Sequence, residues 1–210
     1  MMLHGFSEGA LELRAAPDGS QSLKGRFPYN KPAVLSDGGR SGRPRKEVIA
    51  PGAFSYRVDD EDEDIHLLVG HSYDRPLASR AAGTFLLRDT PAALTFTATI
   101  TAEMQRVSYV QDFLGGYAAG LITGISPGFR IPPERVVPEA ERTDEEDPKL
   151  GMALIRTVLQ ALLYELSVVT KPAYPEAQIE ARNWSLTDGG VVLPDGPDTG
   201  LQRTLSRWRM

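Results

Sequence analysis

The chain has 210 residues, a formal net charge of −5, a charged fraction of 24% and a hydrophobic fraction of 41%. A chain of this length can bury one substantial core, with room for appended segments. Its charged and apolar fractions are those of an ordinary globular protein, which argues against a disordered chain or a membrane protein. The acidic balance disfavours nucleic-acid binding, because phosphate contacts need a basic surface.

The absence of cysteine limits the available chemistry. With no cysteine in the chain, disulfides, a thiolate nucleophile and cysteine-ligated zinc are excluded. The first residues, MMLHGFSEGALELRA, lack the basic flank and apolar centre of a signal peptide. No apolar run approaches the ~20 residues of a membrane-spanning helix. We therefore expect a protein of cytosolic type.

The first quarter of the chain predicts strands and turns. Residues 10–15 and 22–27 flank the sequence PDGS, whose Asp-Gly pair is typical of a hairpin. Residues 28–46 are rich in proline, glycine and basic side chains, which predicts a long loop. The stretch EVIAPGAF (47–54) predicts a strand or turn that leads into a short helix.

An acidic run, DDEDED, follows at residues 59–64. Its spacing lacks the glycine of a calcium-binding loop, so we interpret it as a solvated loop or helix end rather than a metal site. Residues 83–101 then alternate apolar and polar side chains around Thr90–Pro91, which predicts an antiparallel pair of strands.

The best helix candidate spans residues 102–116, with Thr101 as its cap and Gly115–Gly116 at its end. Residues 153–177 are rich in leucine and β-branched side chains and predict two buried strands with a bend between them. Most of the chain therefore predicts β-structure.

The domain organisation follows from composition. We expect one domain over residues 1–182, interrupted by an acidic insertion at about 132–150 that we interpret as a surface loop. Beyond Arg182 the sequence SLTDGGVVLPDGPDTG is typical of a linker, so residues 183–210 are expected to form a flexible C-terminal tail.

Without cysteine, nucleophilic catalysis would use a serine or threonine activated by a histidine. The sequence GISPGFR offers Ser126, and LLVGHSYDRPLASR offers His71. Pro127 biases Ser126 towards an extended conformation and is typical of a strand end, an edge strand or a bulge. The simpler alternatives are a turn serine beside Pro-Gly and a solvated loop histidine.

Four short sequence blocks follow one another along the chain. In this order they resemble the prohead proteases of tailed phages, the family typified by the HK97 maturation protease. They are EVIAPGAF (47–54), LLVGHSYDRPLASR (67–80), GISPGFR (124–130) and LYELSVVTKPAYPEAQI (163–179). The resemblance runs from about Gly25 to Arg182. That family is distantly similar to the herpesvirus assembly proteases. The resemblance therefore implies an α+β, β-rich fold with a closed, herpesvirus-protease-like β-barrel and flanking helices.

The same resemblance implies Ser126 as the nucleophile and His71 as the general base. A third residue must hold the imidazole in its productive tautomer. The herpesvirus proteases use a second histidine there, but no histidine follows Ser126 in this chain. Glu165 is an acid on an otherwise apolar strand, where burial requires a partner, and it is the candidate. The simpler alternative is an exposed or salt-bridged glutamate at a strand bend. Asp74, three residues from His71, is the substitute.

The oxyanion hole needs N–H donors close to the nucleophile. Pro127 has no N–H, so the residue directly after the nucleophile cannot contribute one. Gly128 and Lys171, in the Thr170–Lys171 turn, are the candidate donors.

Two functions from different classes follow. The first is a serine endopeptidase that processes scaffolding or capsid protein and itself during procapsid maturation. The second is a non-catalytic scaffold or capsid-assembly module that keeps the protease fold. A metal hydrolase using His66 and His71 is disfavoured, because residues five apart share neither a helix face nor a strand face.

The resemblance also defines the expected partners. They are the major capsid protein with its scaffolding segment, and further copies of this chain, cleaved by autoprocessing and assembled as a homo-oligomer. The expected location is the procapsid inside the bacterial host cytoplasm. We expect no cofactor, no metal, no nucleic acid and no membrane partner.

Overall fold

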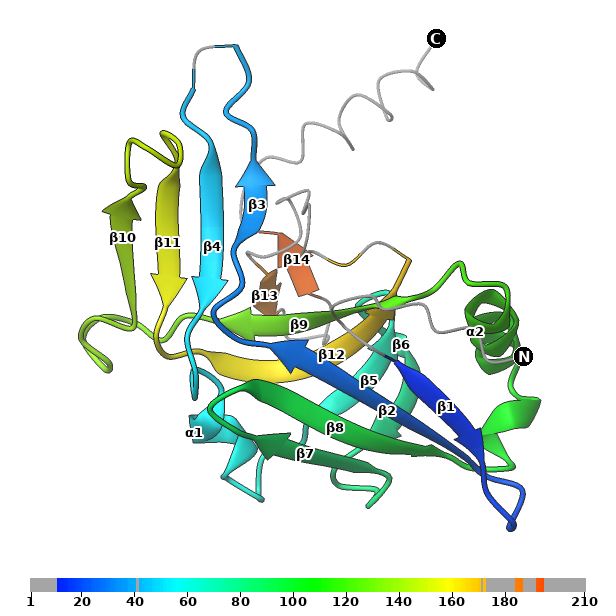
Figure 1. The fold of residues 1–210 in the computed structure, drawn as a ribbon. Coiled ribbons are helices and arrows are strands. Elements are labelled where there is room, and N and C mark those ends of the chain that lie inside the picture. Colours follow the sequence, from blue (N-terminus) through cyan, green and yellow to red (C-terminus); the bar gives the residue numbers. More distant parts are fainter. Residues whose placement is uncertain (1–10, 41, 171, 173–183, 187–191, 195–210) are drawn as a thin grey trace, which may run out of the picture.

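The computed structural model describes residues 11–40, 42–170, 172, 184–186 and 192–194. These residues form three four-stranded sheets and one two-stranded sheet, with a short 3₁₀ helix and two α-helices (Figure 1).

Sheet A contains the first two strands of the chain and a later hairpin. Its order is β1 (Glu12–Ala15), β2 (Gln21–Pro28), β8 (Ala93–Ile100) and β7 (Phe85–Asp89), and all pairs are antiparallel. Both hairpins predicted from the sequence are confirmed. In β8 the apolar residues Leu94, Phe96, Ala98 and Ile100 are buried, whereas the intervening threonines are only half-buried. This is the alternation expected for a sheet with one face on the core.

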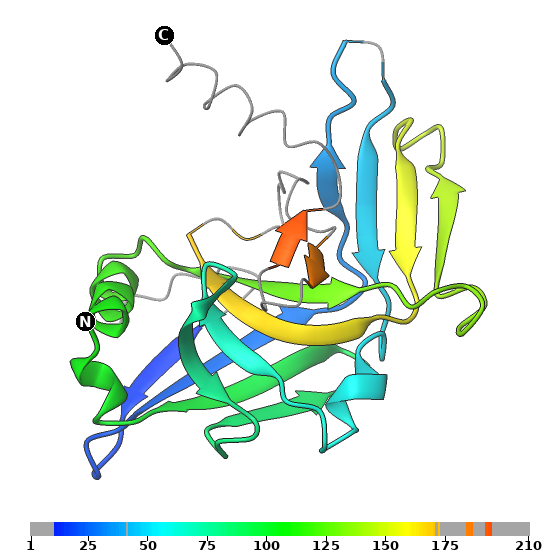
Figure 2. The ribbon, with the colours of Figure 1, turned by 180° about the vertical axis from the view of Figure 1, so that it is seen from behind.

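Sheet C has the order β6 (Ser72–Ser79), β5 (His66–Val69), β12 (Leu162–Val169) and β9 (Gly124–Arg130). β12 runs parallel to β5 and antiparallel to β9. The part of the block 163–179 that forms β12 therefore lies between the blocks at 67–80 and 124–130, although the three are far apart in the sequence. Figure 2 shows β12 and β5 side by side from behind.

Sheet B has the order β10 (Glu141–Glu145), β11 (Leu154–Val158), β4 (Arg45–Ile49) and β3 (Ala33–Ser36) and extends away from the other two sheets (Figure 1). Two loop predictions are wrong here. The region 28–46 contains β3, and the acidic insertion contains β10, whose five residues are all exposed. An apolar alternation could not reveal β10, because it is an edge strand that buries no side chain.

The helices are short and lie between strands. α1 (Ser55–Val58) follows β4, as predicted from EVIAPGAF. The helix predicted over 102–116 is divided into η1 (Met104–Arg106) and α2 (Ser108–Ala118) by Val107, whose ψ of 134° is extended. The Thr101 hydroxyl accepts a hydrogen bond from the Met104 N–H at 3.3 Å, but the N-cap residue of η1 is Glu103 rather than the predicted Thr101. The helix continues past Gly115–Gly116, and Gly120 follows with a φ of 70°.

One hydrophobic core joins sheets A and C. Buried side chains from both sheets belong to it, together with Phe54, which directly precedes α1, and Val110 and Phe113 of α2. At Gly25 of β2 an added Cβ would lie 2.3 Å from the Phe96 ring and 2.5 Å from Ile125 Cδ1 of β9. The two sheets therefore approach closely at this glycine.

The expectation of a closed barrel is wrong. The described strands form separate sheets, and among them β1 and β7 are the edges of sheet A, while β6 and β9 are the edges of sheet C. A barrel requires every strand to be bonded on both sides with a consistent stagger. β6 departs from regular pairing with β5 at two places, and such bulges twist a strand and end its pairing.

Only a small part of the predicted tail is described. β13 (Trp184–Leu186) pairs antiparallel with β14 (Val192–Pro194), so this segment has a local strand partner that the sequence did not reveal. The other residues of the range 183–210, and hence the expected flexibility of the tail, lie outside the described residues. None of the described helices has the length and apolarity to cross a membrane.

Candidate active site

His71 lies at the tip of the hairpin between β5 and β6. Val69 pairs with Ser72, so Gly70 and His71 form the whole connection. Their φ values are 62° and 61°, the positive pair that type I′ hairpin turns require. Glycine adopts this conformation at little cost, but a residue with a Cβ pays about 1–2 kcal/mol. Other contacts must therefore hold His71 in place.

The imidazole of His71 contacts a buried carboxylate. His71 Nδ1 lies 2.8 Å from Glu165 Oε1, and the side chains of these residues are 19% and 5% exposed. β12 carries Glu165 directly beside β5, which ends just before the hairpin tip. The acid predicted from LYELSVV thus contacts the predicted histidine.

Ser126 lies on β9, the neighbour of β12 on its other side. It is 5% exposed and stands directly opposite Ser167 in the antiparallel register. Directly opposed residues share a face of the sheet. Ile125 and Phe129 belong to the core, so the alternating positions Ser126 and Gly128 lie on the opposite face.

Pro127 occupies a position that its chemistry allows. It pairs with Leu166 on the core face of β9. β9 is an edge strand among the described residues, where proline leaves fewer ladder bonds unmade. Of the three alternatives expected from Ser126–Pro127, a strand end, an edge strand or a bulge, the described strands show an edge strand.

Ser167 is the site residue that sequence reasoning missed. Ser167 is fully buried. Its hydroxyl donates a hydrogen bond to Glu165 Oε2 at 2.6 Å, and its Oγ accepts a hydrogen bond from the His71 N–H at 2.9 Å. The available signal was the spacing Glu-x-Ser within a strand, which puts both side chains on one face. Recognising that signal required knowing that β5 pairs with β12.

Gly128 provides space for the Glu165 carboxylate. The two residues are register partners, and a Cβ built on Gly128 would lie 1.9 Å from Glu165 Oε1. Lys171, the other candidate oxyanion donor, lies outside the described residues. Its neighbour Pro172 is described, and a Cβ on Gly124 would lie 2.5 Å from the Pro172 ring. Pro172 therefore lies against the start of β9.

Asp74 and His66 have other positions and contacts: Asp74 lies on β6, and His66 is the register partner of Glu165 on β5. Asp74 is exposed on β6, whereas Glu165 contacts His71 directly. His66 Nε2 lies 3.4 Å from Asp64 Oδ2, and its ring packs edge-on against Tyr73. No group of three or more His, Cys, Asp or Glu side chains that could hold a metal occurs in the part of the chain that the structure describes.

Tyr73 keeps its proton beside the site. Burial, followed by the negative charge of Glu165, raises the pKa of Tyr73 from 10.0 to about 12. Its phenol is therefore neutral over the ordinary pH range and adds no second negative charge near His71.

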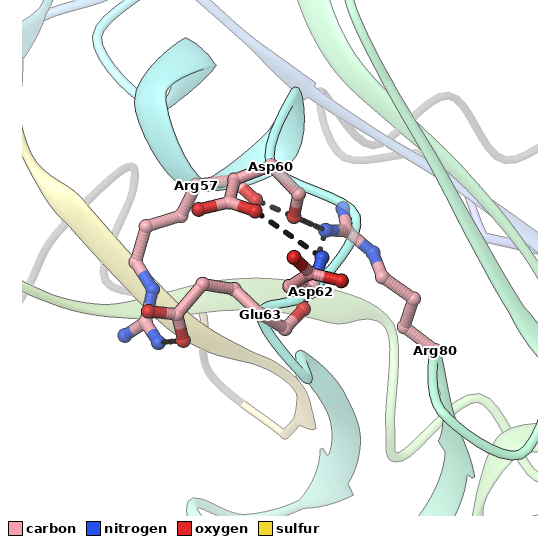
Figure 3. A network of polar contacts seen from close by, with 5 residues as sticks. All are labelled: Arg57, Asp60, Asp62, Glu63 and Arg80. Atoms are coloured by element: carbon pink, nitrogen blue, oxygen red, sulfur yellow. Dashed lines mark hydrogen bonds and ion pairs between the residues drawn. The ribbon is translucent and has the colours of Figure 1, made fainter.

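The acidic run at 59–64 forms a turn that Arg80 organises (Figure 3). The Arg80 guanidinium donates to the backbone carbonyls of four residues: Arg57, Val58, Asp60 and Glu63. The side chain of Glu63 in turn pairs with Arg57. The run is a largely exposed turn that follows the end of α1, in line with the prediction of a solvated loop or helix end.

Arg57 connects this turn to the candidate site. Its guanidinium lies 4.3 Å from the centre of the Tyr164 ring, a cation–π contact. Tyr164 directly precedes Glu165, at the place where the pairing of β12 with β9 shifts register between Leu163 and Glu165. The contact therefore packs α1 against the bulge that leads to Glu165.

Together these side chains have the composition needed for acyl transfer. The serine and the carboxylate lie on the neighbouring strands β9 and β12, and the carboxylate contacts the Nδ1 of the imidazole at the tip of the β5–β6 hairpin. That contact leaves Nε2 as the nitrogen able to exchange a proton with a nucleophile or leaving group.

The comparison with protein families points the same way. A family model described as caudovirus prohead serine protease matches residues 32–189, well over half of the chain. The match includes His71, Ser126, Glu165 and Ser167. No curated protein and no solved structure matches the chain.

Proposed function

Because the chain belongs to the caudovirus prohead serine protease family, and is thus a serine protease of capsid maturation, we propose that Ser126, His71 and Glu165 form its catalytic triad. The observation that carries this assignment is the 2.8 Å contact between His71 Nδ1 and Glu165 Oε1. Glu165 lies on β12, the strand directly beside the one that carries Ser126. In this assignment Glu165, and not Asp74, is the third member of the triad.

Each residue then has a defined role in peptide hydrolysis. Ser126 Oγ attacks the scissile carbonyl while His71 Nε2 accepts the hydroxyl proton, and the histidine later gives that proton to the leaving amine. Glu165 accepts the Nδ1–H bond, fixes the tautomer and stabilises the positive charge that develops on the ring. Water then hydrolyses the acyl-enzyme by the same proton transfers in reverse.

The developing oxyanion needs donors other than Pro127. We assign this role to the N–H groups of Gly128 and Lys171. The support is that Gly128 follows the nucleophile by two residues, and that Pro172, next to Lys171, approaches the start of β9. Preorganised donors of this kind are worth about 10²–10³ in turnover each.

The family implies a capsid protein as the substrate. In finer detail, we assign the major capsid protein and its scaffolding segment as substrates, with the chain itself as a further one. The order of the four sequence blocks supports kinship with the HK97-type maturation proteases. A homo-oligomer enclosed in the procapsid, within the host cytoplasm, would bring enzyme and substrate together.

The alternative is a non-catalytic assembly module with the same fold. A scaffold has no need to bury a carboxylate against a histidine, and burying an ionisable group is costly unless it is partnered. The His71–Glu165 contact therefore favours the protease.

The test is co-expression of the chain with its major capsid protein, followed by mass spectrometry of the fragments. Ser126→Ala should abolish all capsid-protein fragments, because loss of a triad member costs about 10⁴–10⁶ in turnover. Ser22→Ala, on β2 of sheet A, is the matched control and should leave the fragments unchanged. The same fragments from Ser126→Ala would exclude Ser126 as the nucleophile.

A further inference from the structure

The hydroxyl of Ser167 connects His71 and Glu165, the two other members of the proposed triad. It donates to Glu165 Oε2 at 2.6 Å and accepts the backbone N–H of His71 at 2.9 Å. Its residue is fully buried between two strands of sheet C. Both hydrogen bonds are therefore shielded from water. In the protein interior, a hydrogen bond to a charged group is stronger than at the surface.

The two oxygens of Glu165 have different partners. Oε1 contacts His71 Nδ1, and Oε2 accepts the Ser167 hydroxyl. With one partner alone the carboxylate could rotate about its terminal bond, because such sp³–sp² torsions are broad. The second partner fixes the plane of the carboxylate and so directs Oε1 at the imidazole.

The same hydroxyl holds the backbone of the histidine. The hairpin tip places His71 at a φ of 61°, which an L-residue adopts only under constraint. Two N–H groups bind the tip to β12: Gly70 N–H donates to the Val168 carbonyl at 3.0 Å, and His71 N–H donates to Ser167 Oγ. Ser167 therefore supplies one backbone attachment of the tip to β12.

We propose that Ser167 is a positioning residue that fixes the carboxylate and the histidine backbone relative to each other, so that the imidazole faces Ser126. The proposal rests on the triad assigned above. Ser167 is not a second nucleophile, because its proton is donated to Glu165 rather than to the imidazole.

The first test measures the rate at which a fluorophosphonate probe labels Ser126. In this reaction the Ser126 Oγ–P bond forms, the P–F bond breaks, fluoride leaves and His71 takes the hydroxyl proton. The dependence on probe concentration separates the maximal labelling rate from probe binding. Ser167→Ala should lower the maximal rate by about 10- to 100-fold, by analogy with the loss seen when the partner that orients a metal-bound histidine is removed, and leave probe binding unchanged.

A matched pair of substitutions isolates the hydroxyl. Ser167→Thr keeps the hydroxyl, whereas Ser167→Val has nearly the same shape without it. Any packing disturbance from the added methyl is common to both variants. The threonine variant should retain most of the labelling rate, and the valine variant should be as slow as Ser167→Ala. Equal rates for the two variants would overturn the proposal, whatever the behaviour of Ser167→Ala.

Ser20 provides the control for a lost hydroxyl–carboxylate bond. Its Oγ donates to Asp18 at 2.6 Å, also two residues earlier in the chain, in the β1–β2 turn away from the site. Ser20→Ala should change thermal stability without changing the labelling rate. Proton NMR adds a second readout, because the far-downfield signal of the Nδ1–H of His71 should move or broaden in Ser167→Val and persist in Ser20→Ala.

Failure of the triad and failure of this proposal give different results. Labelling of Ser126→Ala at the wild-type rate would show that another residue is the nucleophile. A wild-type labelling rate in Ser167→Val, with Ser126→Ala unreactive, would leave the triad intact and exclude the role of Ser167.

Discussion

Gly128 and Glu165 stand opposite each other on β9 and β12, and the carboxylate of Glu165 occupies the space that a Cβ of residue 128 would fill. The glycine is thus required by the side chain across the sheet rather than by its own backbone, since Gly128 is not among the residues with positive φ. The position that follows the proposed nucleophile by two residues therefore governs where the carboxylate can lie.

The first prediction is that Gly128→Ala folds but loses most of its proteolytic activity. A Cβ at this position would lie 1.9 Å from Glu165 Oε1, and a side-chain end moves more easily than two paired strands. The carboxylate would therefore shift away from His71 Nδ1. Cleavage of the co-expressed capsid protein and thermal unfolding together measure the outcome.

The control for this substitution is Gly115→Ala. Gly115 lies in α2, and an added Cβ meets no atom within 4 Å. That variant should cleave normally and be more stable by about 0.5–1 kcal/mol, because alanine suits a helix interior better than glycine. Full activity in Gly128→Ala would show that catalysis does not require the Glu165 carboxylate at its present position beside His71 Nδ1.

The second prediction separates the two candidates for the third triad member. Glu165→Gln removes the charge that stabilises the imidazolium and should reduce cleavage strongly, since the comparable change in other serine proteases costs about 10⁴ in turnover. Asp74→Asn should leave cleavage unchanged, because Asp74 is exposed on β6. Fragment yields from both variants, measured in parallel with Ser126→Ala, decide between them. The opposite pattern would transfer the role to Asp74.

Local patterns predicted the parts of the fold that depend on neighbouring residues. The hairpins β1–β2 and β7–β8 follow from apolar alternation around turn residues, and β11 and β12 from two apolar runs with a bend. Glu165 was identifiable because an acid on an apolar strand must have a partner.

Long-range pairing was not accessible in the same way. The contact of His71 with Ser167 joins residues 96 positions apart, and it depends on the pairing of β12 with β5, whereas the pairing of β12 with β9 brings Ser126 beside it. The strand β10 buries no side chain and so left no periodic signal. Barrel closure was inferred from kinship rather than from residues, and the sheet edges contradict it.

The third prediction concerns the strained hairpin tip. His71→Gly and His71→Ala should both be inactive, but the glycine variant should be more stable. Glycine relieves about 1–2 kcal/mol of positive-φ strain and loses about 0.4–1 kcal/mol through the greater entropy of its unfolded chain. Urea unfolding should therefore favour His71→Gly by about 0.8 kcal/mol, the difference between the midpoints of these two ranges.

The neighbouring position serves as the control. Ser72 belongs to β6 and is not among the residues with positive φ. Ser72→Ala should therefore be more stable than Ser72→Gly, the reverse of the order at position 71. The same order at both positions would show that the backbone at His71 is not strained.

The last prediction is that the active protein cleaves its own C-terminal segment. Residues 183–210 are rich in turn-forming residues and carry few apolar side chains, a composition suited to entering a protease site as an extended chain. Within this range β13 and β14 pair with each other, and backbone engaged in a ladder is unavailable to a protease. We therefore expect cleavage at a bond within residues 195–210, which would release a fragment that ends in TLSRWRM. Intact-mass measurement should find a shortened chain for the active protein and the full-length chain for Ser126→Ala. A full-length C-terminus in both proteins would exclude autoprocessing at this end of the chain.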